Sequence, residues 1–557
     1  VLGFKYDAGL ADWKKVKTAN LYEDLNGSTA KALNRKLYEA SVTLLRNEND
    51  LIPLTSLDTL SIAYVSIGGS LSNDHLAETL KLYGRVATFA FDENSKIKDI
   101  PEILKALNPY NLVILGVRNT NIFSYRNYGI SDADHSLIRE ITSRKKTILS
   151  LLASPYALSA MNFENLPDAL LVSYQDNELS EDVAAEAIFG GIAVKGKLPV
   201  SVHPWFKTGD GLDTDDTRLA ITDPESLGIK QEYIQKADSI AMSGILQKAY
   251  PGCQVIAVKD GQVFYNKAFG YHTYEGIEAV KKTDLYDIAS VTKIAATGLA
   301  LMDLYGKKEI DIDQRLSKYL PYLKSTDKKD IIIREMMAHQ SRLKAWIPYY
   351  QYTIEDSIRE KVYAAGISED YPVRVAEGMY IHRDYNVIIF DSIRFSGLRN
   401  SNYYKYSDLG YYLIKEAIEG IRNRPFEQFV EERYYASLGL PTMGYLPLKR
   451  FSRDRIVPTE DDKIFRKQLL QGDVHDQGAA MLGGVSGHAG LFSNAFDLAV
   501  VMQMLLDQGE YGGRHYLNGD VVGEFTKTQF PLNQNRRGIG FDKPMLEYDE
   551  DGPTCRS

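Results

Sequence analysis

A serine and a lysine three residues apart, Ser290 and Lys293, are the pair in this sequence best suited to covalent chemistry. Residues three apart on a helix share one face, with Cβ atoms about 5–6 Å apart, so the lysine amine can reach the serine hydroxyl. Burial lowers the pKa of a lysine amine, which then accepts a serine proton more readily. The pair predicts a nucleophilic serine with a lysine as its base.

The stretch that follows this serine predicts a buried helix. From Ile294 to Leu304 nearly every residue is apolar or small, and a helix that is apolar on all sides lies inside a core. Gly306 and the two lysines after it are typical of a helix end. Ser290 would then lie at the helix N-terminus, where unpaired N–H groups favour a developing oxyanion.

The spacing by itself is not specific. Ser-x-x-Lys also occurs at five other places in the chain: Ser28/Lys31, Ser95/Lys98, Ser143/Lys146, Ser325/Lys328 and Ser341/Lys344. Because such a motif carries meaning only in its structural context, the long buried helix singles out Ser290.

Composition bounds the function classes. The chain has 557 residues with 44% hydrophobic and 25% charged residues, enough for three or four domains of ordinary globular protein. A net charge of −9 argues against a nucleic-acid partner. The two cysteines are too few for a disulfide framework, and the nine histidines form no metal-binding motif, so we expect no metal and no cofactor. No apolar window is long enough for a transmembrane segment, and the oligomeric state stays open.

The first two hundred residues alternate helical and strand-like patterns. Apolar residues up to Leu45 recur at helix-like spacing, which predicts helix to about residue 50. Strand-like runs and amphipathic stretches then alternate, which predicts a mainly parallel sheet covered on both faces. The expected strands are 60–67, 86–91, 111–117, 147–152 and 169–174, and the expected helices are 101–108, 132–144 and 155–165.

Three motifs in this region, at 41–54 (SVTLLRNENDLIPL), 184–190 (AAEAIFG) and 196–202 (GKLPVSV), resemble the C-terminal α/β sandwich domain of glycoside hydrolase family 3. The resemblance covers residues 1–205 and implies an α/β/α sandwich that follows a catalytic TIM barrel, with residues 1–10 similar to the segment just after that barrel. The sandwich offers no carboxylate pair that could flank a glycosidic bond, so we expect it to support the barrel rather than to catalyse.

Residues 206–225 are polar, acidic and rich in turn formers, which predicts a linker. An amphipathic helix is expected over 233–245. The runs 253–259 and 262–269 flank Asp260-Gly261, a strong hairpin signal.

The order of helix, hairpin and Ser290-x-x-Lys293 resembles the serine beta-lactamase and penicillin-binding protein superfamily, closest to class C enzymes and related esterases. The resemblance runs over residues 226–557 and implies an α+β DD-peptidase (transpeptidase) fold. It implies that Tyr406 matches a tyrosine proton shuttle. Asp408 replaces the usual asparagine two residues later, and exchanging an amide donor for an ionised acceptor argues against β-lactam or amide recognition.

A third superfamily motif, a lysine or histidine followed by Ser or Thr and Gly, is expected on a strand. His488-Ala-Gly490 has similar letters, but residues 491–505 predict a helix beginning right after it, so we favour His488 as a loop residue. The resemblance then implies that the motif lies past Ser557 and that the domain is truncated at its C-terminus. Asp476, with His475, is expected to be a wall residue of the pocket.

Taken together, these features predict a fragment of a bimodular hydrolase. A family 3 β-N-acetylglucosaminidase without its barrel would be joined to a beta-lactamase-like serine hydrolase, acting on carbohydrate or cell-wall-derived material. The resemblance also suggests a periplasmic or extracytoplasmic location. The alternative is a non-catalytic module with a beta-lactamase fold that binds cell-wall peptides or esters.

Overall fold

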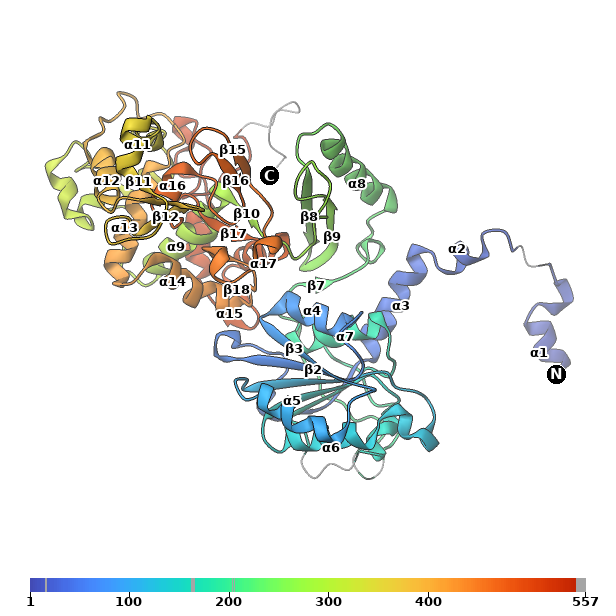
Figure 1. The fold of residues 1–557 in the computed structure, drawn as a ribbon. Helices are drawn as coiled ribbons and strands as arrows, with labels where there is room; N and C mark the ends of the chain where they lie inside the picture. The colour runs from blue at the N-terminus through green and yellow to red at the C-terminus, as the bar shows by residue number, and fades with distance from the viewer. Residues whose placement is uncertain (16–17, 162–165, 203, 205, 547–557) are drawn as a thin grey trace.

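The computed structural model describes residues 1–15, 18–161, 166–202, 204 and 206–546 (Figure 1). An N-terminal part is built around one large sheet, and a second part holds the remaining elements. The N-terminal elements are α1 (Leu2–Asp7), α2 (Leu21–Leu25), α3 (Ser28–Ser41), β1 (Thr43–Asn47), β2 (Ile62–Gly68), α4 (His75–Tyr83), β3 (Val86–Asp92), α5 (Ile100–Ala106), β4 (Leu112–Val117), α6 (Asp132–Thr142), β5 (Lys146–Leu151), β6 (Ala169–Val172) and α7 (Glu178–Phe189).

Six strands form the N-terminal sheet in the order β1-β6-β5-β4-β2-β3, and all neighbours are parallel except β1 with β6. Side chains of alternate residues enter two separate cores. One core packs against α4 and α7 and the other against α5 and α6, so helices lie on both faces (Figure 1). The five strand predictions are confirmed within two residues at each end, apolar runs being typical of strands buried on both faces.

The helix predicted to about residue 50 is wrong in its last part. The helix α3 ends at Ser41, and the next residues form the edge strand β1. Leu33 and Leu37, two of the apolar residues that recur at helix-like spacing, are 58% and 60% exposed. The helix instead buries Arg35, whose guanidinium bonds Glu186 of α7 at 2.6 Å. Because that ion pair turns the Arg35 face of the helix towards α7, the face that packs is not the one that the apolar residues predict.

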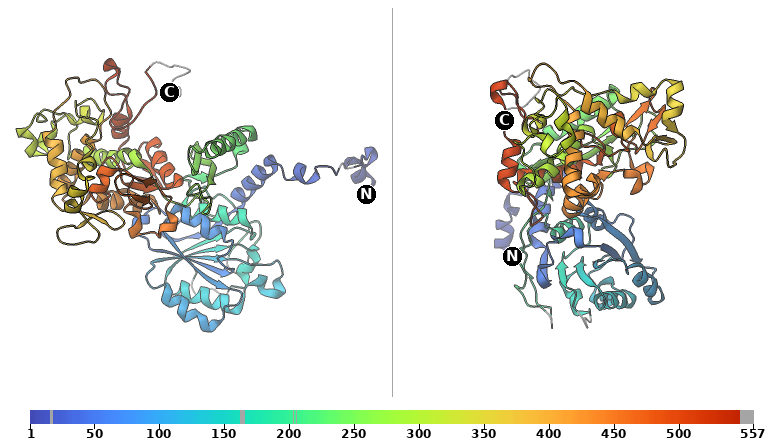
Figure 2. Two further views of the ribbon diagram at one scale, coloured as in Figure 1. Left: turned by 45° about the horizontal axis from the view of Figure 1, so that its top comes forward. Right: turned by 90° about the vertical axis from the view of Figure 1, so that its left-hand side faces the viewer.

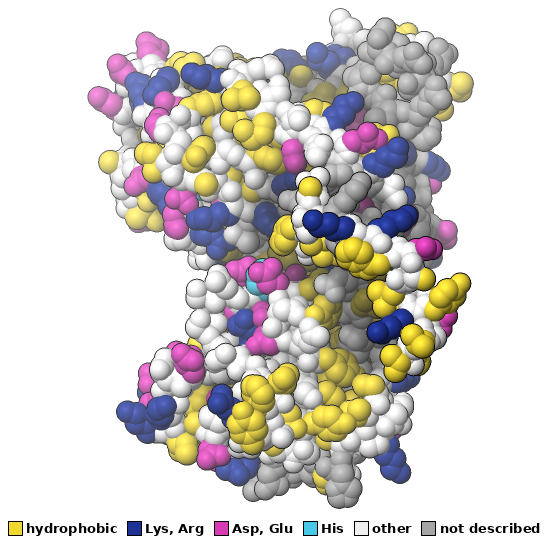
Figure 3. Space-filling view, turned by 90° about the vertical axis from the view of Figure 1, so that its right-hand side faces the viewer, with side chains coloured by type: hydrophobic (Ala, Val, Ile, Leu, Met, Phe, Trp, Pro, Cys, Tyr) yellow, Lys and Arg dark blue, Asp and Glu magenta, His cyan; other side chains and the backbone are white. Residues whose placement is uncertain are grey.

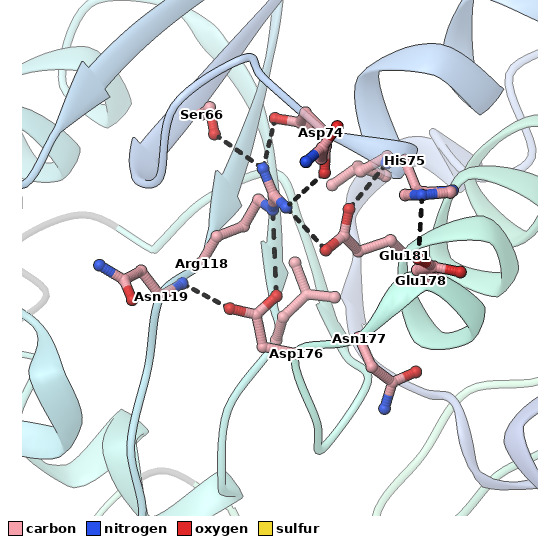
Figure 4. Close-up of polar contacts among 12 residues, drawn as sticks. Ser66, Asp74, His75, Arg118, Asn119, Asp176, Asn177, Glu178 and Glu181 are labelled. Atoms are coloured by element: carbon pink, nitrogen blue, oxygen red, sulfur yellow. Dashed lines mark hydrogen bonds and ion pairs between the residues drawn. The ribbon is translucent and has the colours of Figure 1, made fainter.

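A second arginine, largely but not fully buried, ties together the carboxyl ends of the parallel strands (Figure 4). Arg118, just after β4, lies 2.8 Å from Asp74 and 2.8 Å from Glu181, and 3.9 Å from Asp176. Asp74 is fully buried and also accepts the Tyr64 hydroxyl at 2.9 Å. Burial raises the pKa of Glu181 even though Arg118 opposes that shift. This Arg118 network joins three loops and the start of two helices.

The second part begins with β7 and ends in α18. Its elements are β7 (Ala220–Ile221), α8 (Gln231–Leu246), β8 (Gly252–Lys259), β9 (Gln262–Gly270), β10 (Tyr286–Asp287), α9 (Leu299–Gly306), α10 (Ile333–Met337), α11 (Asp356–Val362), β11 (Tyr363–Ala364), β12 (Val373–Ala376), β13 (Met379–Ile381), α12 (Tyr385–Phe395), α13 (Leu409–Arg422), α14 (Phe426–Val430), α15 (Ala436–Leu438), β14 (Gly444–Tyr445), β15 (Glu460–Asp462), β16 (Gln468–Leu470), α16 (Gln477–Met481), β17 (Leu491–Ser493), α17 (Ala495–Leu506), β18 (Glu510–Tyr511), β19 (Arg514–His515) and α18 (Gly519–Thr526).

The predicted helix and hairpin at the start of this part are confirmed. The helix α8 spans the expected residues and precedes the antiparallel pair β8–β9. The hairpin turns at Asp260 and Gly261, which have φ of 51° and 72°, as a tight two-residue turn between twisted strands requires. Behind them, one extended core surrounds α9 and α13.

Residues 206–225, predicted as a linker, connect the two parts but are built into both. Leu212 donates its N–H to Leu44 O at 2.7 Å, beside the large sheet. Arg218 is buried and bonds the carbonyls of Phe189 and Leu54 at 3.0 and 2.9 Å. Next, β7 pairs with β9 of the second part. The segment therefore makes backbone hydrogen bonds with both parts.

Side chains also join the two parts directly. Tyr83 of α4 stacks on Phe189 with ring centroids 5.4 Å apart and meets Phe496 of α17 edge-on at 6.2 Å. Ion pairs cross the same boundary between Arg85 and Glu431 and between Asp58 and Arg514. The buried aromatic contact is the larger stabilising element, because exposed ion pairs contribute little.

The first helices form an arm that extends away from the body (Figure 2). Large apolar side chains on α1 and α2, among them Phe4, Tyr22 and Leu25, are exposed, and apolar atoms are prominent on this side of the molecule (Figure 3). In the described ranges, no helix combines the length and the apolar character needed to cross a bilayer.

Candidate functional site

The strand β10 and a tight turn present Ser290. At β10, Asp287 pairs with Phe492 of β17, and Ile288 then donates its N–H to Leu491 O at 3.0 Å. Ala289 follows with φ of 44°, a left-handed conformation that is strained for alanine, and its N–H bonds Asp287 Oδ1 at 2.8 Å. Strained backbone of this kind often occurs at functional sites. The turn leaves Ser290 exposed at the start of a helical run.

That run differs from the predicted single α-helix only in its winding. Residues 289–291 form a 3₁₀ turn, Lys293–Gly298 form a π-helical segment and α9 continues to Gly306. Wide π turns inside helices are frequent at functional sites. The run is buried from Ala295 to Leu304, as the sequence indicates. Hydroxyls of Tyr434 and Tyr435 bond its carbonyls, both at 2.9 Å.

Lys293 is buried, with 3% of its side chain exposed, and three oxygens surround its amine. Nζ lies 2.9 Å from Ser290 Oγ, 3.1 Å from the carbonyl oxygen of His488 and 2.7 Å from Asp408 Oδ1. The oxygens of Ser290 and His488 accept hydrogen bonds from the ammonium, and Asp408 pairs with it as the counter-ion. Asp408 is the N-cap residue of α13 but its carboxylate caps no backbone N–H there. It pairs with the lysine instead.

Aromatic rings enclose the same amine. Nζ lies 5.0 Å from the ring centroid of Tyr406 and 5.3 Å from that of Tyr411, within cation–π range. The guanidinium of Arg537 lies 5.5 Å from the Tyr406 ring. Two cations, Lys293 and Arg537, therefore lie beside the Tyr406 ring.

His339 orients the loop that carries Tyr406. Its ring is 4.5 Å from the Tyr406 ring, and its Nδ1 accepts the N–H of Ser407 at 3.1 Å. Burial, together with Arg537 and Lys293, lowers the pKa of His339 to about 3. A neutral imidazole is therefore packed beside the two cations.

His488 is a buried loop residue, as predicted, but the helix expected right after it is wrong for its first residues. Leu491–Ser493 form the strand β17, and only then does α17 begin, with Asn494 as its cap. β17 lies between β10 and β14, and a central position in a sheet requires an extended backbone. His488 bonds Ser486 through Nδ1 and Asp476 through Nε2, and its ring stacks on Tyr412.

A cavity of about 270 Å³ adjoins this group of residues. Asp408, Asp476 and His488 line it together with the aromatic residues Trp346, Tyr349, Tyr350 and Tyr412. Burial by itself would raise the pKa of Asp476, but His488 and the N–H of Ala479 hold it well below its usual range. Asp476 is thus the pocket-wall residue that the sequence predicts, whereas His475 does not line the cavity.

All four predicted site residues lie around one amine. Ser290 and Asp408 contact Lys293 directly, and Tyr406 contributes the face of its ring. Sequence reasoning missed the lining aromatics, His339 and Arg537. No local pattern separates these residues from others of their types, in a chain with nine histidines and 37 tyrosines. In the described residues, no group of three or more His, Cys, Asp or Glu side chains could hold a metal ion.

A protein-family model described as Beta-lactamase matches residues 231–542. A protein of Escherichia coli (strain K12) with the provisional name D-alanyl-D-alanine carboxypeptidase is 31% identical over 335 residues, which are 55% of this chain and 72% of that protein. The N-acetylmuramyl-L-alanine amidase of Bacillus subtilis (strain 168) is 31% identical over 316 residues, 52% of this chain and 67% of the relative.

Among solved structures, the octameric penicillin-binding protein homologue from Pyrococcus abyssi aligns with 19% identity and a TM-score of 0.40. The alignment covers 53% of this chain and 60% of that chain. The family match begins at residue 231, so it does not include the six-stranded sheet. The resemblance to glycoside hydrolase family 3 gains no support from these comparisons.

Proposed function

The chain belongs to the beta-lactamase family, and from this premise we propose that residues 226–557 form a serine hydrolase domain that works through an acyl-serine. Ser290 would be the nucleophile. The contact that supports this most is the 2.9 Å distance between the exposed serine hydroxyl and the buried amine of Lys293. A nucleophile within hydrogen-bond reach of its base, with the base held by a third group, is the arrangement that activates serine.

In this proposal Oγ of Ser290 attacks the substrate carbonyl, its proton passes to Lys293 or Tyr406, and the leaving group departs with a proton. Water then cleaves the ester and restores the serine hydroxyl. Because Lys293 is paired with Asp408, it accepts the serine proton only if one of its own protons moves towards that carboxylate or towards Tyr406. We therefore assign Lys293 as proton acceptor, Tyr406 as shuttle and Asp408 as the partner that controls the lysine.

We propose peptide or ester bonds of cell-wall material as the substrate class, and this sets aside the expectation from Asp408 that amides are not recognised. The names of both relatives given above refer to the cleavage of bonds in peptidoglycan, and each relative is about 31% identical to this chain. An acidic chain of net charge −9 offers little attraction for nucleic acid.

For residues 1–205 we propose the family 3 glycosidase-type sandwich as a supporting domain. Its basis is the resemblance of the three motifs, together with the order of strands and helices. The buried carboxylates of the Arg118 network are paired to one cation and are poor candidates for flanking a glycosidic bond. Aryl β-N-acetylglucosaminides should therefore stay intact with this chain, and robust turnover would contradict the supporting role.

The alternative function is a binding module without turnover, and covalent labelling separates the two. A fluorophosphonate probe should label the protein, and Ser290→Ala should abolish the labelling. Ser143→Ala is the matched control, because this exposed serine belongs to another Ser-x-x-Lys in the N-terminal part. Labelling that survives in Ser290→Ala would refute the nucleophile assignment. Absence of labelling in the unchanged protein, with tight binding of cell-wall peptides, would favour the binding module.

A further inference from the structure

The cavity beside Lys293 combines aromatic walls with acidic groups. Four of its lining residues are aromatic: Trp346, Tyr349, Tyr350 and Tyr412. Aromatic faces attract cations through their ring quadrupole. A volume of about 270 Å³ suits a small group rather than a polymer.

Two carboxylates give this cavity its charge. Asp408 and Asp476 both line it, with 23% and 34% of their side chains exposed. Asp408 uses Oδ1 on Lys293, while Asp476 uses Oδ1 on His488 and on a backbone N–H. Of the residues that line the cavity, none is a lysine or an arginine. A cationic ligand group would find an acceptor oxygen on each carboxylate.

Tyr349 supplies an independent observation. Its side chain lines the cavity and is 6% exposed, and its hydroxyl is buried without a hydrogen-bond partner among the described residues. A buried hydroxyl without a partner is costly, so such groups in native proteins usually meet a water or a ligand. Burial and the nearby charges of Asp476 and Asp408 raise the pKa of Tyr349, so this hydroxyl stays neutral and can donate or accept.

The cavity lies next to the reacting serine. Asp408 contacts Lys293 at 2.7 Å, and Lys293 contacts Ser290 Oγ at 2.9 Å. A ligand group bound by Asp408 is therefore within a few bonds of a carbonyl attacked by Ser290. In this setting Asp408, where the superfamily has an amide, adds a negative charge to the acyl-group site.

We propose that this cavity selects acyl donors with a free ammonium group close to the scissile carbonyl, such as aminoacyl esters and aminoacyl amides. The inference rests on the acyl-serine function proposed above and adds its substrate class. Ser290 takes the aminoacyl group and releases the alcohol or amine, and water then frees the amino acid. The ammonium stays unchanged between Asp408, Asp476 and the aromatic walls.

The test compares two phenyl thioesters of the same shape, alanyl and isobutyryl, in which an ammonium replaces a methyl group. Each kcat/KM is divided by the rate with hydroxide alone, so that the greater electrophilicity of the alanyl ester cancels, and both enantiomers of alanine are tried. We expect the better alanyl ester to be preferred by about tenfold or more, the range of a desolvated cation among aromatic rings and carboxylates.

Substitutions then locate the preference. Asp476→Asn should reduce the alanyl-to-isobutyryl ratio by about tenfold, and Trp346→Leu by a few-fold, because each removes part of the attraction for the ammonium. Asp461→Asn, at the exposed central residue of strand β15, should leave the ratio unchanged. The ratio cancels any loss of catalytic power that the two esters share.

A ratio near one in the unchanged protein would overturn the inference, as would a ratio that both Asp476→Asn and Trp346→Leu leave intact. Hydrolysis of both thioesters at equal rates, with labelling at Ser290 retained, would leave the acyl-serine function standing without this specificity. Loss of labelling at Ser290 would refute the proposed function itself, and the inference with it.

Discussion

Two buried cations organise the two parts of the molecule, and their surroundings differ. Arg118 contacts three carboxylates near the ends of parallel strands, and Asp74 and Glu181 are almost fully buried (Figure 4). Lys293 contacts one carboxylate, one backbone oxygen and one exposed hydroxyl. The arginine, planar and always charged, is suited to holding acids in place. The lysine is a point charge that can give up a proton.

A buried ion pair by itself therefore says little about function. The side chains of both cations are 11% exposed or less, and both pair with carboxylates that are distant in the sequence. Of the two, only Lys293 contacts an exposed serine hydroxyl, with a strained turn before that serine and a cavity with an unpaired hydroxyl nearby. We therefore expect changes to Arg118 to act on stability and changes around Lys293 to act on rate.

The largest effect is expected for Arg118→Met. Without the guanidinium, Asp74 and Glu181 remain buried without a cation, and breaking a buried pair in this way costs about 3–5 kcal/mol. Urea unfolding should show the loss of stability. Arg144→Met, which removes only an exposed pair with Glu140, should cost less than about 1 kcal/mol. If Arg118→Met instead slowed labelling at Ser290 in the folded protein, the contrast between the two cations would fail.

Lys293→Met should act on rate. Loss of the proton acceptor should slow acylation of Ser290 by about 10²-fold or more, the contribution typical of a positioned general base. The measurement is the second-order rate of fluorophosphonate labelling. The control is Lys31→Met, at an exposed lysine of another Ser-x-x-Lys. Lys328 belongs to such a motif too, but it is fully buried and its loss would disturb the fold. Equal labelling rates in Lys293→Met and the unchanged protein would exclude the lysine from proton transfer.

The surroundings of Lys293 should also make the free energy of unfolding depend on pH, through His339. Since the pKa of His339 is about 3 in the folded protein against 6.5 ordinarily, the unfolded chain binds this proton first. The contribution of the neutral His339 to the free energy of unfolding is fully present above pH 6.5. It is lost below that pH at about 1.4 kcal/mol per pH unit, or about 2 kcal/mol by pH 5.

His339→Gln should remove this part of the acid dependence, measured as the difference in unfolding free energy between pH 7 and pH 5. His515→Gln, at a histidine with 80% of its side chain exposed, is the control and should leave the dependence unchanged. Identical pH dependence in His339→Gln would show that this imidazole is not held neutral. Arg537, Lys293 and Asp542 are the charged groups that act on it.

The smallest effect is expected for Asp408→Asn, which restores the amide found elsewhere in the superfamily. Without the carboxylate, removing a proton from Lys293 costs less, so acylation by a neutral probe should become faster by about tenfold or less. The labelling rate at pH 7 measures it, with Asp461→Asn as a control for lost surface charge. Slower labelling would mean that Asp408 helps to move the proton rather than restraining it.

Local sequence determined the elements that depend only on neighbouring residues. The strands of the large sheet, the hairpin at Asp260-Gly261 and the buried run after Ser290 followed from apolar patterns and turn chemistry, which act within a few residues. The closeness of Ser290 and Lys293 followed from helix spacing, although a 3₁₀ turn and a π-helical segment replace the ideal helix.

Tertiary structure alone decided the partners of Lys293. Asp408 and the carbonyl of His488 reach it from far along the chain, and no periodicity records which distant segments pack together. The same holds for β1 and β17, where pairing with a neighbouring strand overrides the helical pattern. The sequence thus determined that Ser290 and Lys293 lie together. Packing determined the charge balance of this pair and the cavity beside it, because both arise from contacts between residues remote in the chain.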